Sequence, residues 1–319
     1  MHNISRRNFV LSATAASAAF GLNGPLEFIG SAQAQAYANA KLIDKGFYKF
    51  KVGDVEVTQI YDGIWNRAFE DNFVKNAQPD QVKAALKAGG LADNIIPIPF
   101  TITVVKMKGK YVMFDSGTGG QVQSTAGLMA AKNMKAAGID PAKIETVIVT
   151  HFHPDHIFGL MAKDTNAQTY PNATIYLPKP ELAWWTGSSV PQPAQGISNR
   201  VKATFPGWKN VQQIDGDKEV VGGVRSIATP GHTSYLVGSG KQQLLVLGDI
   251  TNIPLLFVKN PGWHAVFDAD GPLAETNRRK IMDRAIADKL IVAGYHYSMP
   301  GAGTFKRDGN GYVFVPVRA

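Results

Sequence analysis

The sequence contains no cysteine in its 319 residues. This absence excludes disulfide bonds, iron–sulfur clusters, thiolate zinc sites and cysteine nucleophiles, so any metal must be held by histidine and carboxylate side chains. Charged residues are also few. They make up 18% of the chain, whereas hydrophobic residues make up 45%. This composition excludes a disordered chain and predicts a globular protein with a sizeable core.

Runs of like charge are missing as well, although the formal net charge is +8. The basic residues are scattered along the chain and form no block. A protein that binds nucleic acid through charge concentrates its basic residues in a patch or stripe. We therefore expect no nucleic-acid partner.

The N-terminus has the pattern of an export signal. Arg6 and Arg7 stand directly before an apolar stretch of mostly small residues, 9–22. This stretch is too short to span a bilayer, which takes about 20 apolar residues. Ala-x-Ala sequences at 32–34 and 34–36 offer sites for signal peptidase. We expect residues 1–36 to be a cleaved twin-arginine signal peptide and the mature protein to be periplasmic, with no stable membrane anchor.

The remaining chain, 37–319, alternates apolar runs with turns and helical segments. Hairpins are predicted for 47–61 and 98–114, and helices for 79–86, 126–137 and 273–287. Further short strands are predicted for 146–150, 174–177, 224–228, 244–247 and 290–293. No repeat or low-complexity linker divides this region, so we predict one domain of two β-halves with helices outside.

Three histidines and one aspartate follow the predicted strand 146–150. In an extended segment, residues two apart point the same way, so His151 and His153 can converge on one ion. Pro154 keeps His153 extended, since it disfavours the α conformation of the residue before it. Asp155 and His156 would then start a helix and face a second position nearby.

Three more candidate ligands stand at the ends of apolar strands, each one or two residues after a glycine. His232 follows the strand 224–228 in the sequence Thr-Pro-Gly-His-Thr, Asp249 follows 244–247, and His296 follows 290–293. Loops that project side chains from strand ends are common places for functional sites. A single such residue usually has a structural role, but together they indicate a metal centre.

The order of these motifs resembles the metallo-β-lactamase fold hydrolases: an H-x-H-x-D-H loop, then Pro-Gly-His-Thr, Gly-Asp and a C-terminal histidine. Within that family the chain is similar to methyl parathion hydrolase and the N-acyl-homoserine lactonases. This closer likeness is found in Asp115-Ser116-Gly117, Met299-Pro300-Gly301 and the segments 170–174, 230–236, 288–294 and 311–317. The resemblance implies an α/β fold, the αββα sandwich, in which two mixed β-sheets pack face to face with helices outside.

The resemblance also implies two divalent metal ions, zinc first, with manganese, cobalt or iron as alternatives. The implied ligands are His151, His153 and His232 for one ion and Asp155, His156 and His296 for the other, with Asp249 between them. Two dications about 3.5–4 Å apart need a shared anion, and a hydroxide between them is a nucleophile at neutral pH. Asp155 and Asp249 are thereby the implied catalytic residues. True β-lactamases of the family lack the bridging carboxylate.

Further roles are implied around the metals. Asp115 matches a buried carboxylate that orients a ligand histidine through its second ring nitrogen. Trp184, Trp185 and Phe158 are expected to wall the substrate pocket, with ordinary core packing as the alternative for the tryptophans. The family often forms dimers, so a homodimer is an open alternative to a monomer.

We therefore predict an exported dinuclear metallohydrolase that uses a metal-bridging hydroxide to cleave a small neutral ester, first of all an acyl-homoserine lactone. An organophosphate triester hydrolase of the methyl parathion hydrolase type is the alternative. Two more distant alternatives are a diiron redox protein and a non-enzymatic metal-binding protein. The diiron variant of the fold usually has Glu where this chain has His153.

Overall fold

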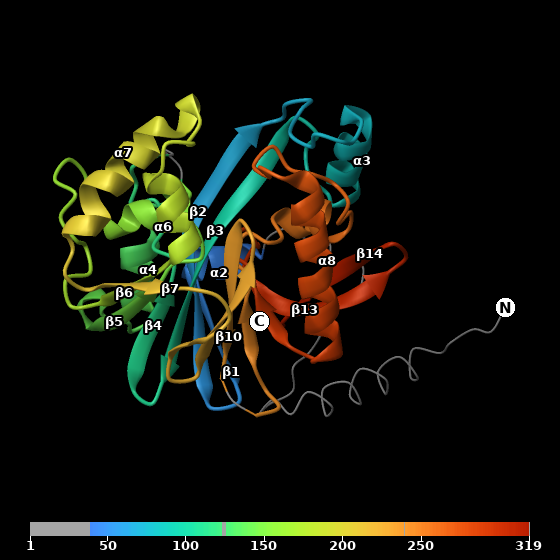
Figure 1. The fold of residues 1–319 in the computed structure, drawn as a ribbon. Helices are drawn as coiled ribbons and strands as arrows, with labels where there is room; N and C mark the ends of the chain where they lie inside the picture. The colour runs from blue at the N-terminus through green and yellow to red at the C-terminus, as the bar shows by residue number, and fades with distance from the viewer. Residues whose placement is uncertain (1–38, 123–125, 239, 319) are drawn as a thin grey trace.

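The computed structural model describes residues 39–122, 126–238 and 240–318. The predicted signal peptide and its cleavage site lie outside these residues. Two seven-stranded mixed sheets form the centre of the described part (Figure 1). Within these ranges, no helix is both long and apolar enough to cross a membrane.

The first sheet has the strand order β1-β2-β3-β4-β5-β6-β7. Neighbours from β1 to β4 are antiparallel, and those from β4 to β7 are parallel. Its strands are β1 (Phe47–Val52), β2 (Val55–Ala68), β3 (Ile95–Met107), β4 (Lys110–Phe114), β5 (Ile144–Ile148), β6 (Thr174–Pro178) and β7 (Val211–Ile214).

The second sheet has the order β14-β13-β12-β11-β10-β9-β8. Its neighbours are antiparallel except for β11 and β12, which are parallel. Its strands are β8 (Glu219–Val221), β9 (Val224–Thr229), β10 (His232–Val237), β11 (Leu244–Val246), β12 (Ile291–Ala293), β13 (Ala302–Asp308) and β14 (Gly311–Pro316).

Helices lie outside the sheets, with α4, α6 and α7 on the side of the first sheet and α8 on the side of the second (Figure 1). The α-helices are α2 (Ala40–Lys45), α3 (Pro79–Ala88), α4 (Ala130–Ala136), α5 (Pro154–Ile157), α6 (Lys179–Thr186), α7 (Gln195–Thr204) and α8 (Gly271–Ala287). A π-helix spans Ile253–Val258, and 3-10 turns span Pro141–Lys143, Phe158–Leu160, Gln192–Ala194 and Phe205–Gly207.

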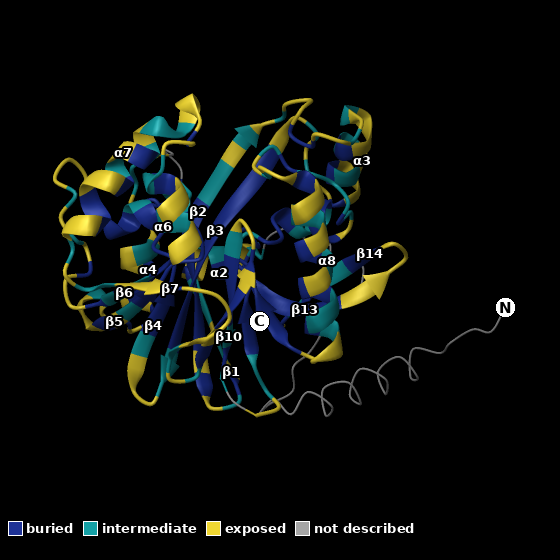
Figure 2. Cartoon of the chain, viewed as in Figure 1, coloured by how far each residue is buried: buried dark blue, intermediate teal, exposed yellow. Residues whose placement is uncertain are grey.

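The core consists of layers that join the sheets and helices. Side chains of both sheets pack together between them, among them Val105 and Phe114 from the first and Tyr235 from the second. On the outer face of the second sheet, Val292 packs in one cluster with Met282 of α8. Figure 2 shows the strands mostly buried between helices whose outward faces are exposed. The predicted αββα sandwich is confirmed.

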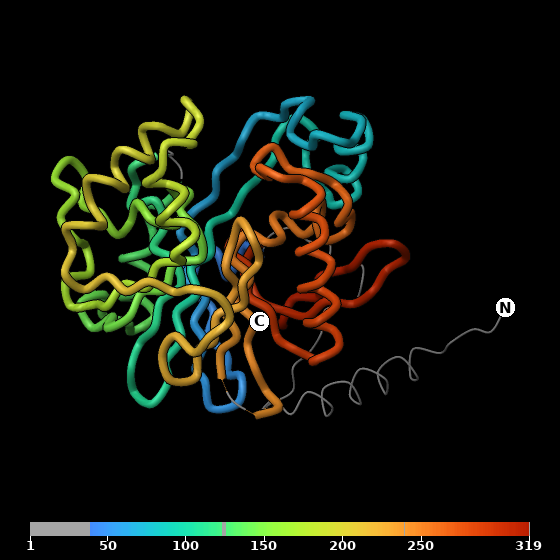
Figure 3. Tube along the Cα trace, viewed as in Figure 1, coloured from blue at the N-terminus to red at the C-terminus, as the bar shows by residue number. Residues whose placement is uncertain are grey.

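Parallel strand pairs decide where the functional residues meet. β4 runs parallel to β5, and β11 runs parallel to β12. Asp115 and His151 come shortly after the first pair, and Asp249 and His296 come shortly after the second. Figure 3 shows most of the green-to-yellow part of the chain on one side of the molecule and most of the orange-to-red part on the other. Loops from the two halves of the chain therefore supply one site together.

One predicted helix starts later than expected. The sequence pattern predicts a helix over 126–137, whereas α4 begins at Ala130. The buried carboxylate of Asp62 on β2 explains the start, because its Oδ1 accepts hydrogen bonds from the amides of Met129 (2.9 Å) and Ala130 (2.6 Å). A side chain distant in the sequence thus satisfies amides at the helix N-terminus.

Candidate metal centre

The histidine-rich loop begins where β5 leaves the sheet. β5 ends at Ile148, two residues before the predicted end, because the Thr150 amide donates to Asp115 Oδ1 (2.8 Å). The backbone is extended at His153 (φ −66°, ψ 151°), and α5 starts at Pro154. His151 and His153 therefore precede a helix whose first turn carries the next two candidate ligands, Asp155 and His156.

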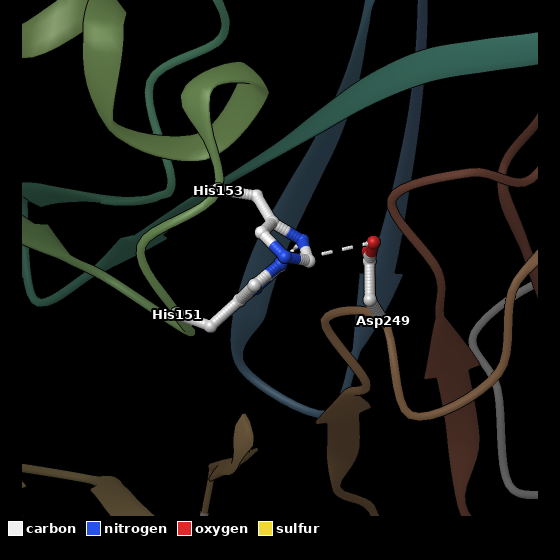
Figure 4. Close-up of side chains that lie close together, drawn as sticks. All are labelled: His151, His153 and Asp249. Carbon is white, nitrogen blue, oxygen red and sulfur yellow. Dashed lines mark hydrogen bonds and ion pairs between the residues drawn. The ribbon is translucent and has the colours of Figure 1, made fainter. Parts of the chain in front are cut away.

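Six of the candidate side chains form two groups of three. Within each group, the possible ligand atoms lie within 4.8 Å of one another. The groups are His151, His153 and Asp249, and Asp155, His156 and His296. Figure 4 shows the two histidines of the first group on one loop, facing Asp249 on another. His232 lies beside this group, with its ring centroid 4.4 Å from that of His151. The structure thus brings all seven predicted ligands together.

The Asp249 carboxylate lies between the two groups. Its Oδ2 is 3.9 Å from His151 Nε2 in one group and 3.0 Å from His296 Nε2 in the other. Its Oδ1 is 3.4 Å from His156 Nε2. One side chain therefore faces both groups, which is the position that a bridging carboxylate requires.

Hydrogen bonds outside the two groups orient their histidines. Asp115 Oδ2 is 2.8 Å from His156 Nδ1, and the carbonyl of Pro99 is 2.9 Å from His296 Nδ1. Both contacts use Nδ1, so Nε2 of each ring faces the carboxylates of the site. Such outer partners fix the ring orientation of metal-binding histidines. This is the role that the sequence analysis assigns to Asp115.

The donor atoms of this centre suit a divalent cation. His156 Nε2 and Asp249 Oδ1 are buried, and neither has a hydrogen-bond partner among the described residues. His151 Nε2 also faces His153 Nδ1 at 2.9 Å, so two nitrogen atoms converge. Buried polar atoms without partners are costly, and imidazole nitrogens and carboxylate oxygens are ligands that zinc accepts. The residues present therefore fit a metal centre.

The protonation states agree with this fit. Burial lowers the pKa of His151 and His153, and lowers that of His232 to about 4, so these rings are neutral at pH 7. Neutral imidazole is the form that binds metal. Burial also acts to lower the pKa of His156, but nearby carboxylates, Asp249 foremost, raise it well above its ordinary value. The carboxylates thus give this part of the site a strong attraction for positive charge.

A cavity of about 160 Å³ lies beside the ligands. Its lining consists of ligand-loop residues, four apolar side chains and one amide, namely His153, Pro154, Asp155, Asp249, His296, Trp65, Ile98, Val122, Phe267 and Asn252. Among the described residues, no lysine or arginine lines it. The cavity therefore presents apolar walls and a single neutral polar side chain beside the candidate metal centre.

Arg67 contacts two of the aromatic residues that line the cavity, Trp65 and Phe267. The Arg67 guanidinium lies 5.4 Å from the ring centroid of Trp65 and 5.5 Å from that of Phe267. It also forms an ion pair with Glu70 (2.9 Å). Cation–π contacts of this kind attract the rings to the charge. Arg67 thereby joins a wall residue of β2 to one that precedes α8.

The predicted pocket residues Trp184, Trp185 and Phe158 are not among those that line this cavity. Trp184 is 44% exposed on α6, whereas Trp185 is buried in the core and donates its indole N–H to Glu181 (3.2 Å). The Arg200 guanidinium lies over the Phe158 ring, 4.4 Å from the centroid of that ring. The aromatic side chains that line this cavity are Trp65 and Phe267, and the predicted role of Trp184, Trp185 and Phe158 in a substrate pocket stays a prediction.

Comparison with known families supports this architecture. A family model described as the metallo-beta-lactamase superfamily matches residues 99–294. Ribonuclease Z of Pyrococcus abyssi (strain GE5 / Orsay) is 36% identical over 58 residues, which are 18% of this chain and 16% of that protein. Ribonuclease Z of Thermococcus onnurineus (strain NA1) is 34% identical over 58 residues, 18% and 15% of the two chains. The chain thus matches only a small part of these relatives.

Solved structures are similar over much more of the chain. AidC, described as a dizinc quorum-quenching lactonase in complex with a product, has a TM-score of 0.79 and 25% identity, covering 86% of this chain and 98% of AidC. The hydrolase AbOPH has a TM-score of 0.78 and 23% identity over 86% and 98% of the two chains. An N-acyl homoserine lactone lactonase has a TM-score of 0.56 and 15% identity over 83% and 100%. The last two similarities show the fold alone.

Proposed function

This chain belongs to the metallo-beta-lactamase superfamily, and from that premise we propose that it hydrolyses small uncharged esters with two divalent cations, acyl-homoserine lactones being the natural class. The observation that carries the proposal is the Asp249 carboxylate, which lies 3.4 Å from His156 Nε2 and 3.0 Å from His296 Nε2 while also grouping with His151 and His153. The similarity to AidC, described as a dizinc lactonase, supports it.

Two divalent cations, when bound, supply a water-derived nucleophile at neutral pH and a Lewis acid for the ester oxygen. The residues that would hold them are His151, His153 and His232 on one side and Asp155, His156 and His296 on the other, with Asp249 shared. We propose zinc, since neutral imidazole and carboxylate suit it and AidC is described as dizinc. Manganese, cobalt and iron accept the same ligands.

The surrounding residues hold this arrangement before substrate enters. Asp115 orients His156, and the Tyr295 hydroxyl donates to the backbone carbonyl of Asp155 (2.6 Å). The buried Tyr295 ring also packs on His156, with centroids 4.1 Å apart. Ligands fixed in advance need little rearrangement during the reaction, which is a large part of catalytic efficiency.

The cavity favours an uncharged substrate with an apolar arm. Trp65, Ile98 and Phe267 can pack against such an arm and exclude water. Asn252 Oδ1 is buried without a partner among the described residues, so it offers an acceptor for the N–H of an acyl amide. Phosphate monoesters and nucleic acids need cationic clamps, which the described lining lacks. The short similarity to ribonuclease Z therefore does not lead us to propose a ribonuclease.

A substrate panel tests the proposal. The zinc-loaded protein is assayed with acyl-homoserine lactones of several chain lengths, an aryl ester, a dimethyl phosphotriester and a cephalosporin. We expect the lactones to give the highest kcat/KM and the cephalosporin no turnover. Efficient triester cleavage without lactone turnover would make the protein a phosphotriesterase instead.

A matched pair of histidine variants shows whether turnover depends on the proposed centre. His153→Ala removes a ligand and should abolish turnover of every substrate. His264→Ala is the control, because His264 lies outside both groups and pairs with Glu275 (3.5 Å). Equal turnover in the two variants would rule out catalysis at this centre.

A further inference from the structure

A carboxylate outside the two ligand groups reaches the histidine loop from a neighbouring helix. Glu181 lies in the first turn of α6, and its Oε2 accepts a hydrogen bond from the backbone amide of Phe152 (3.0 Å). The same oxygen accepts the indole N–H of Trp185 (3.2 Å). Glu181 therefore links α6 to the one residue that separates His151 from His153.

Phe152 is fixed by its side chain as well as by its amide. Its ring is fully buried and lies 5.4 Å from the ring centroid of Phe205. The ring contact limits sliding of the loop, whereas the amide hydrogen bond sets the orientation of the peptide that joins His151 to Phe152. Phe152 is therefore fixed at its amide and at its ring, and the backbone leaves it toward His153 in a set direction.

The orientation of the His153 ring depends on the backbone conformation more than the orientation of the His151 and His156 rings does. His151 Nδ1 lies 3.0 Å from Thr150 Oγ1, and His156 Nδ1 lies 2.8 Å from Asp115 Oδ2. The hydrogen-bond contact of the His153 ring in the described part of the chain is to another ligand, since its Nδ1 faces His151 Nε2 at 2.9 Å. Its place is therefore set by Pro154 on one side and by the Phe152 peptide on the other.

We propose that Glu181 is a positioning residue of the metal centre, which fixes the backbone at Phe152, between His151 and His153, in the conformation that lets both rings bind one cation. The inference rests on the metal dependence in the proposed function. Trp185 then acts through Glu181, because its indole N–H helps to hold the carboxylate in place. This role of Trp185 differs from the one that the sequence analysis predicts, which is to line the substrate pocket.

The hydrogen bond and the charge of Glu181 can be separated by substitution. Glu181→Gln keeps an acceptor oxygen of similar reach and cannot carry a negative charge. Glu181→Ala removes both. Ser198→Ala is the packing control, since Ser198 Oγ donates to the Trp185 carbonyl (2.6 Å) and stabilises α6 against α7 without contacting Glu181 Oε2.

The test measures zinc affinity of the folded protein by competition with a chromophoric chelator, together with the visible absorption spectrum of the cobalt-loaded protein. We expect Glu181→Ala to weaken one zinc site about tenfold or more, the range found for outer partners of metal ligands, and to shift the cobalt bands. Glu181→Gln and Ser198→Ala should stay close to the unsubstituted protein in both measurements.

Three results would overturn the proposal. The first is an unchanged zinc affinity and cobalt spectrum in Glu181→Ala. The second is an equal loss in Ser198→Ala, which would indicate general packing. The third is an equal loss in Glu181→Gln, which would indicate charge. If Glu181→Ala does not fold, Glu181→Met, which keeps the side-chain length and lacks the acceptor, takes its place.

The zinc and cobalt measurements use no ester. Failure to cleave lactones would therefore overturn the proposed function and leave the Glu181 result intact. Unchanged zinc binding in Glu181→Ala, combined with normal lactone cleavage in the parent protein, would overturn the positioning role alone.

Discussion

Asp115 supports the centre through three contacts. Its Oδ1 accepts from the Thr150 amide (2.8 Å), and its Oδ2 lies 2.9 Å from Thr150 Oγ1 and 2.8 Å from His156 Nδ1. Its φ of 59° is in the left-handed region, which asparagine also tolerates. Asp115→Asn should therefore fold but weaken zinc binding by about 10–100-fold, since its amide cannot accept at both positions. Chelator competition measures this loss, and unchanged affinity would remove Asp115 from the metal centre.

Asp62 predicts a pH dependence of stability away from the metal site. Burial raises its pKa to about 7, although hydrogen bonds from the Ala130 and Met129 amides act to lower it. The folded protein therefore holds this proton more tightly than the unfolded chain, and the Asp62 contribution becomes less favourable as the pH rises from about 4 to 7. Between pH 5 and 8 the ionisation of Asp62 should lower the free energy of unfolding by about 2.5 kcal/mol.

Asp62→Asn isolates that contribution, because the other titrating groups are common to both proteins. Urea unfolding of the parent and the variant at pH 5 and pH 8 gives the two free-energy differences. The variant should lose less stability than the parent over this interval. An identical loss in both proteins would show that the pKa of Asp62 does not lie in this interval and would contradict the prediction.

Among single residues, the sequence predicts the candidate metal ligands far better than the residues that line the cavity. His151, His153 and Asp249 are readable because each stands in a short motif directly after an apolar strand. Trp65 and Phe267 carry no such signal, because they come from distant parts of the chain and meet only through tertiary packing around Arg67. Glu181 was missed for the same reason, since its partner Phe152 belongs to another element.

Among the elements, the segment 249–268 positions one ligand and part of the cavity wall. Arg278 of α8 anchors this segment, and its side chain is only 2% exposed. The guanidinium donates to three backbone carbonyls of this segment and to Asp268 Oδ2, at 2.7–3.2 Å. Arg278 thus ties several parts of the segment that carries Asp249 and Phe267 to α8.

Arg278→Met should lower the free energy of unfolding by about 3–5 kcal/mol, because it leaves Asp268 buried without its partner. It should also lower kcat, since Asp249 is in the segment that loosens. Arg279→Met is the control, because that neighbour is 39% exposed and pairs with Glu275 on the surface (2.8 Å), which predicts a loss under about 1 kcal/mol. Thermal unfolding and lactone turnover of both variants compare the two, and equal losses would refute the role of Arg278.

Strands were easier to predict than the helices of the outer layer. The apolar run at 244–247 corresponds to β11, because a strand buried on both faces leaves continuous apolar sequence. The segment 224–228 corresponds to β9, in which buried and exposed residues partly alternate. α6 and α7 gave no periodic signal, since a proline in the first turn of α6 and polar residues along α7 obscure the apolar face. Their place is fixed by contacts such as Ser198 with the Trp185 carbonyl.

For the whole molecule, we propose export in the folded state through the twin-arginine route. Replacing Arg6-Arg7 by Lys-Lys should keep the protein in the cytoplasm with its signal uncut, because that route requires the arginine pair. Immunoblots of periplasmic and cytoplasmic fractions measure the distribution. Periplasmic protein of mature size from the Lys-Lys variant would contradict the signal assignment.

The central claim is that one site assembled from both halves of the chain uses two metal ions to hydrolyse an ester. The most direct measurement is the metal content of the protein purified without added metal, followed by lactone turnover as a chelator removes the ions and zinc restores them. We predict about two transition-metal ions per chain and turnover that falls and returns with the second ion. A single ion with no second site on titration, or turnover unchanged after both are removed, would contradict the claim.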